Sequence, residues 1–86
     1  MSTKKKRTRR KRIFIVLIDD NVNSFDHVVK VLMNVCSHNY YQAQQCALLT
    51  HNNGQCEIYS GFDPEVYFTS KALINFGLSI KLLIKK

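Results

Sequence analysis

The chain has 86 residues, 45% of them hydrophobic, which suits one small globular domain with a modest core and argues against a wholly disordered protein. The formal net charge of +7 is concentrated at one end, because residues 1–12 hold eight of the 13 lysines and arginines and no acidic residue. The rest of the chain carries five lysines against six acidic residues, so a partner of this body need not be anionic.

Residues 1–12 show no apolar periodicity, and we expect a disordered basic tail ahead of one core domain over residues 13–86. The core begins with the uninterrupted apolar run IFIVLI at residues 13–18. Such a run is typical of a strand buried on both faces, so we place it at the centre of a sheet. The run is too short to cross a bilayer, and we expect a cytoplasmic protein without a membrane segment.

A first helix is predicted after this strand, with Asn23 or Ser24 as its N-cap. Apolar residues then recur at intervals of three and four, which is typical of one face of a helix. This predicted core face consists of Phe25, Val28, Val29, Leu32, Val35 and Cys36.

A second helix is predicted after the break at residues 37–39. Asn39 and Gln42 have the spacing of a capping box, His51 lies in the last turn, and Gly54 marks the stop. The predicted core-facing stripe consists of Tyr40, Ala43, Ala47 and Leu48, with Cys46 and Thr50 beside it.

Residues 56–59 alternate in the manner of a short strand. A third helix is predicted after the turn SGFDP, with Asp63 as N-cap, Pro64 as first residue and Gly77 as stop. Its expected apolar side consists of Val66, Phe68, Ala72, Leu73 and Phe76. The segment at residues 78–84 predicts a last strand, which would place on one face Leu78, Ile80, Leu82 and Ile84. The predicted fold class is therefore α+β, a small sandwich of a three-stranded antiparallel sheet packed by three helices in the order β-α-α-β-α-β.

Three polar side chains suggest a binding site. Asp19 and Asp20 follow the first strand and His51 ends the second helix, so packing of these elements would bring all three to one edge of the domain. Two carboxylates attract a cation, and an apolar hollow beside them would accept a hydrophobic group. A free peptide N-terminus with a bulky first side chain offers both, because its α-amine is mostly protonated near neutral pH. The expected apolar hollow consists of Phe25, Val28, Ala47 and Thr50.

Other interpretations of the same residues stay open. Adjacent acidic residues after a strand are usually solvated loop residues, and a histidine at a helix C-terminus usually interacts with the helix dipole. Paired carboxylates also suggest acid–base catalysis or a divalent cation, but His27 and His38 lack ligand spacing and no nucleophile has a matched base. The cysteines form no C-x-x-C pair and are interpreted as reduced, small apolar side chains. We therefore expect no enzyme, no metal and no cofactor.

The stretches DDNVNSFDHVVKVL and QAQQCALLTHNNGQC resemble ClpS, the family of small adaptors that deliver substrates to a Clp AAA+ protease. The resemblance covers about residues 13–84 and is nearest to the Bacteroidetes-like branch of the family. It implies that Asp20 and His51 bind the substrate α-amine. The neighbouring Asp19 and Asn21 exchange acid and amide relative to the Asn-Asp-Asp of the family, which leaves the net charge unchanged.

The resemblance also implies an apolar pocket formed by both first helices and the last strand. Phe25 falls where many members have methionine, Ala47 replaces a larger methionine, and Thr50 replaces an aliphatic residue. The implied pocket lining is Asn23, Phe25, Val28, Ala47, Thr50 and Leu78.

The function implied by the resemblance is an adaptor that binds N-degron substrates, meaning proteins with a free α-amine and a bulky hydrophobic first residue, and delivers them to a Clp AAA+ unfoldase. The expected partners are the N-terminal domain of that unfoldase and the substrates, with the adaptor acting as a monomer. The alternative is a small nucleic-acid-binding protein that acts through residues 1–12, with an affinity that falls steeply with salt. A third interpretation is an interaction module whose carboxylates are merely solvated.

Overall fold

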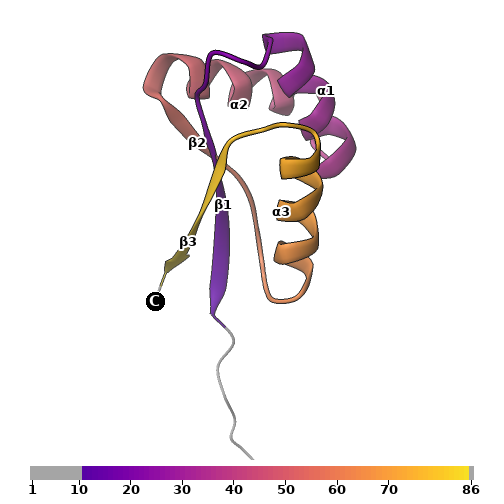
Figure 1. The fold of residues 1–86 in the computed structure, drawn as a ribbon, viewed down its shortest axis with the longest axis vertical. Coiled ribbons are helices and arrows are strands. Elements are labelled where there is room, and N and C mark those ends of the chain that lie inside the picture. The colour runs from indigo at the N-terminus through magenta and orange to yellow at the C-terminus, as the bar shows by residue number, and fades with distance from the viewer. Residues whose placement is uncertain (1–10, 86) are drawn as a thin grey trace, which may run out of the picture.

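The computed structural model describes residues 11–85, and it contains three strands and three helices arranged around one sheet (Figure 1). Their order, β-α-α-β-α-β, confirms the predicted fold class. The elements are β1 (Arg12–Ile18), α1 (Phe25–Val35), α2 (Tyr40–Asn53), β2 (Gln55–Gly61), α3 (Glu65–Asn75) and β3 (Ile80–Lys85). Residues 1–10 of the expected tail lie outside the described residues, and Arg12, predicted to belong to the tail, is the first residue of β1.

The sheet is antiparallel with the order β2-β1-β3, so the continuous apolar strand is the central one, as predicted. Leu17 pairs with Cys56 on one side and with Ile80 on the other. The register against β2 shifts between Ile15 and Val16, which is a β-bulge or similar irregularity. The edge strands differ from the prediction, because β2 extends over Gln55–Gly61 and β3 begins only at Ile80.

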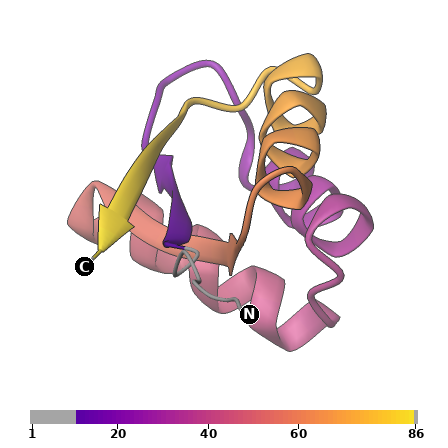
Figure 2. The same cartoon turned by 90° about the horizontal axis from the view of Figure 1, so that it is seen from below.

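The helices pack on the sheet and on one another around a single core. α3 packs against all three strands, α2 packs on β2, and α1 packs on α2 and α3. Figure 2 shows α1 and α3 on the same side of the sheet. The core includes the alternate β1 residues Ile13, Ile15 and Leu17. No helix within residues 11–85 is both long enough and apolar enough to cross a membrane.

Local capping bonds set most helix ends. Ser24 caps α1 by accepting a hydrogen bond from the backbone N–H of His27, and Asn39 caps α2 in the same way. Gly54 ends α2 with φ of 91°, a left-handed conformation that glycine adopts without strain. The cap predicted for α3 is wrong: Pro64 is the N-cap residue and no side chain caps the helix. Backbone carbonyls of the preceding turn accept from the first amides instead, as in the bond from Val66 N to Phe62 O.

Several side chains expected in the core are exposed. The buried face of α3 consists of Val66, Ser70 and Leu73. Phe68 is 70% exposed because it lies two positions after Val66, on the other side of the helix. Ser70 can be buried because its hydroxyl donates to the carbonyl oxygen of Val66 at 2.7 Å. The other exposed residues that were predicted on the apolar sides of helices are Phe25, Tyr40, Leu48 and Phe76. Leu82 and Ile84, predicted to share one face of the last strand, are exposed as well.

Candidate functional site

A cavity of about 340 Å³ opens where β1 ends. Its walls come from the loop after β1, the first turn of α1, the second half of α2 and the segment that precedes β3. The lining residues are Leu17, Ile18, Asp19, Asp20, Asn21, Asn23, Phe25, Val28, Ala47, Thr50, His51 and Leu78. The structure therefore brings all ten predicted site residues into one cavity. Sequence reasoning missed Leu17 and Ile18, whose place in the apolar strand indicated only core.

Asp20 is the best-connected residue of the rim. Its Oδ1 accepts hydrogen bonds from the backbone N–H groups of Val22 and Asn23, both at 3.0 Å, while the side-chain Nδ2 of Asn23 donates to both carboxylate oxygens. The hydroxyl of Ser79 donates to Oδ2 at 2.8 Å. These bonds, above all the one from the Asn23 backbone, hold the pKa of Asp20 below its usual range despite partial desolvation. Asp20 is therefore ionised at neutral pH.

The same bonds limit what Asp20 can do for a ligand. A carboxylate has about four lone-pair positions, and the donors of Val22, Asn23 and Ser79 already make five contacts with it. A bound cation would feel the charge of Asp20, but a direct hydrogen bond would have to displace one of these donors. Asp19, Asn21 and His51, in contrast, are exposed residues of the same cavity.

Ser79 and Asn23 join two distant loops. Besides its bonds to Asp20, Asn23 donates through Nδ2 to the carbonyl oxygen of Gly77 at 2.9 Å. The loop after β1 and the connection from α3 to β3 therefore lie together, near the top of Figure 1. No sequence pattern identified Ser79 as part of the site, because it reaches Asp20 across 59 positions.

The deeper part of the cavity is apolar. Ala47, Thr50 and Leu78 are each no more than 5% exposed. The hydroxyl of Thr50 donates to the carbonyl oxygen of Cys46 at 2.8 Å, so its polar group is already satisfied within α2. Phe25, predicted on a core face, is 43% exposed and forms part of the cavity wall. The site thus combines an apolar floor with an acid, amide and imidazole rim.

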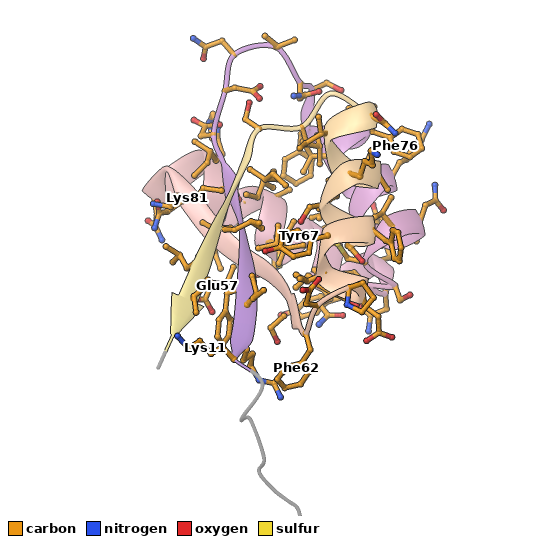
Figure 3. The ribbon with its side chains drawn as sticks, turned by 60° about the horizontal axis from the view of Figure 1, so that its bottom comes forward. Lys11, Glu57, Phe62, Tyr67, Phe76 and Lys81 are labelled. Carbon is orange, nitrogen blue, oxygen red and sulfur yellow. The ribbon has the colours of Figure 1, made fainter. Side chains whose placement is uncertain are left out.

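The remaining histidines have structural partners. His27 Nε2 lies 2.8 Å from the carbonyl oxygen of Phe76, the residue labelled at the end of α3 in Figure 3, and His38 Nε2 lies 2.8 Å from that of Ile58. A carbonyl oxygen can only accept, so each Nε2 carries a proton. Over residues 11–85, no group of three histidine, cysteine or acidic side chains could hold a metal ion.

The three cysteines are free thiols. Burial raises the pKa of Cys36 to about 11. Burial and the neighbouring thiols of Cys56 and Cys36 raise the pKa of Cys46 to about 12. Neither Cys36 nor Cys46 is therefore an activated nucleophile at neutral pH.

Comparison with known proteins identifies the family. The family model described as "ATP-dependent Clp protease adaptor protein ClpS" matches residues 8–76. ClpS adapter proteins from Campylobacter jejuni strain 81-176 and from C. jejuni subsp. doylei are each 38% identical over 48 residues, or 54% of this chain. The matched region spans only half the length of those relatives.

A solved structure supports the fold independently. Agrobacterium tumefaciens ClpS2, determined bound to L-phenylalaninamide, superposes with a TM-score of 0.79 over 90% of this chain and 100% of its own. At 16% identity, this likeness establishes the architecture alone. The family model, in contrast, covers most of the sequence, and the chain belongs to the ClpS family of ATP-dependent Clp protease adaptor proteins.

Proposed function

We propose that this protein is an adaptor that binds polypeptides through a free α-amine and a bulky apolar first side chain and delivers them to a Clp AAA+ unfoldase. The observation that carries the proposal is the single cavity in which an apolar floor meets an acidic and imidazole rim. The related ClpS2 was solved with L-phenylalaninamide, which has a free α-amine next to a benzyl side chain.

The rim suits an ammonium group. Three N–H donors taken out of water need three acceptors, because an unpaired charge is expensive to desolvate. We assign direct contacts to Asp19, Asn21 and His51, whose side chains are exposed, and an electrostatic contribution to Asp20. His51 would accept in its neutral form. Asn23 would act by holding Asp20 in place.

The floor suits one large apolar side chain. Burying a phenylalanine or leucine side chain contributes about 1.5–3 kcal/mol. The contacts would come from Val28, Ala47, Thr50 and Leu78, and Phe25 would close one side. We expect phenylalanine, leucine, tyrosine or tryptophan as the first residue of the substrate.

The proposed activity consists of binding and transfer, with no covalent step and no cofactor. The adaptor would act in the cytoplasm as a monomer and would dock on the N-terminal domain of the unfoldase. The proposed division of the chain is a basic tail ahead of one adaptor core domain.

The proposal is tested with a labelled peptide that begins with phenylalanine and with its N-acetylated form, each titrated by fluorescence anisotropy. We expect the free peptide to bind and acetylation to abolish binding. His51→Ala and Asp19→Asn should each weaken the free peptide by about tenfold, the value of one charge-assisted hydrogen bond. The matched controls, Asn52→Ala and Glu65→Gln, change exposed residues outside the cavity and should leave affinity unchanged. Equal affinity for the two peptides would refute the proposal.

Nonspecific contact between residues 1–12 and nucleic acid stays a prediction. Only Lys11 and Arg12 of this segment lie among the described residues. The guanidinium of Arg12 lies 4.9 Å from the ring centre of Phe62 and donates to Ser60 Oγ at 3.2 Å, so Arg12 already has partners in the domain. Figure 3 shows Phe62 next to the start of β1.

A further inference from the structure

A second hollow of about 320 Å³ lies between α1 and α2, next to the first cavity. α1 contributes most of its lining and α2 contributes two residues. The lining is Phe25, Asp26, Val29, Lys30, Met33, Tyr40 and Gln44.

Phe25 belongs to both hollows, and no other described residue lines the two. The two hollows therefore adjoin at Phe25. Because Phe25 is 43% exposed, a chain lying across its outer surface would pass directly from one hollow to the next.

We consider a bound peptide in the extended conformation. Successive side chains point to opposite faces, so the first and third share a face, and at a rise of about 3.3 Å per residue they lie roughly 7 Å apart. A peptide that places its first side chain in the first cavity would turn its second side chain away. The third side chain would then come down beyond Phe25, about one side chain further on.

We infer that the second hollow is a subsite for the third side chain of the bound polypeptide and that it favours an uncharged apolar residue. This inference rests on the proposed function.

The chemistry of the lining sets the expected preference. Met33 and Tyr40 are exposed apolar or aromatic residues that gain by being covered. Asp26 and Lys30 carry opposite charges four positions apart on α1, so neither sign of charge on a ligand is favoured. The amide of Gln44 already donates to the hydroxyl of Tyr40 at 2.8 Å. A leucine or methionine side chain would bury apolar surface here without leaving a charge unpaired.

The test uses two peptides of identical composition that begin Phe-Ser-Leu and Phe-Leu-Ser, each with a free and an acetylated N-terminus. We expect the Phe-Ser-Leu peptide to bind about three- to tenfold more tightly, as partial burial of one leucine should produce. Met33→Ala should remove this preference and leave the requirement for a free amine intact. The control Asn34→Ala changes the next, exposed residue of α1, which lies outside both hollows, and should keep the preference.

The two proposals fail in different ways. If acetylation abolishes binding but the two sequences bind equally, or if Met33→Ala keeps the preference, the subsite is refuted and the proposed function stands. If the free and acetylated peptides bind equally, the proposed function is refuted and the subsite with it.

Discussion

Asn23 connects the two loops that form the polar rim, so replacing it with alanine should loosen both. Its side-chain nitrogen lies 3.1 and 3.0 Å from the carboxylate oxygens of Asp20 and 2.9 Å from the carbonyl oxygen of Gly77. A hydrogen bond to a charged group contributes about 1.5–3 kcal/mol and a neutral one about 0.5–1.5 kcal/mol. Since the rim is partly exposed, we take the lower end and expect the free energy of unfolding to fall by about 2 kcal/mol.

Urea unfolding followed by circular dichroism measures this loss. For a domain of this size, 2 kcal/mol corresponds to a fall in the urea midpoint of roughly 1–2 M with an unchanged m-value. The control is Asn21→Ala, which removes an exposed asparagine from the same loop and should change the free energy of unfolding by less than about 0.5 kcal/mol.

The pH dependence of this stability loss tests whether the charge of Asp20 causes it. The pKa of Asp20 is lower in the folded than in the unfolded protein, so its stabilising effect is present above the unfolded value of 3.8 and is lost as pH falls through the folded value. The difference between the wild type and Asn23→Ala should therefore narrow below about pH 4. A loss of unfolding free energy below about 0.5 kcal/mol at pH 7 would contradict the reasoning. So would a loss at pH 3 as large as the loss at pH 7.

Two further predictions concern the floor of the cavity and the thiols. Ala47→Leu adds three carbon atoms to the floor and should weaken phenylalanine-led peptides by at least tenfold in anisotropy titrations, with a thermal melt to check that the variant stays folded. Unchanged affinity would show that the first side chain binds elsewhere. At pH 8, Cys36 should react with iodoacetamide about 100-fold more slowly in the native than in the unfolded protein, because its pKa rises from 9.0 to about 11. Cys46 should react more slowly still. The reaction rates are measured by mass spectrometry of timed samples, and equal rates in the native and unfolded protein would contradict this prediction.

Much of the architecture is predictable because its determinants are local. The continuous apolar run of β1 is typical of a strand buried on both faces, and the structure places it at the centre of the sheet. Ser24 and Asn39 each bond to an amide three positions away, and Gly54 needs only its own left-handed φ. Such features require no knowledge of distant residues.

The cavity was predicted from short-range motifs and a family resemblance, and the structure brings those residues together without testing their roles. What sequence could not decide is how their hydrogen-bonding capacity is used. Asp20 was predicted to bind an amine, and this stays a prediction; the structure adds that its carboxylate already accepts from its own loop and from Ser79. Ser79 lies next to Asp20 because β3 pairs with β1, so no local pattern records the contact.

Side-chain burial on the helices likewise depends on contacts that local sequence does not indicate. Apolar residues lie on more than one side of α3, so its sequence indicates a helix without indicating which side is covered. Packing against the sheet buries the face with Val66 and Leu73 and leaves Phe68 in water. Periodicity along one chain segment determined secondary structure. Which side of a helix is buried, and which donors bond to Asp20, depended on contacts between segments that are distant in sequence.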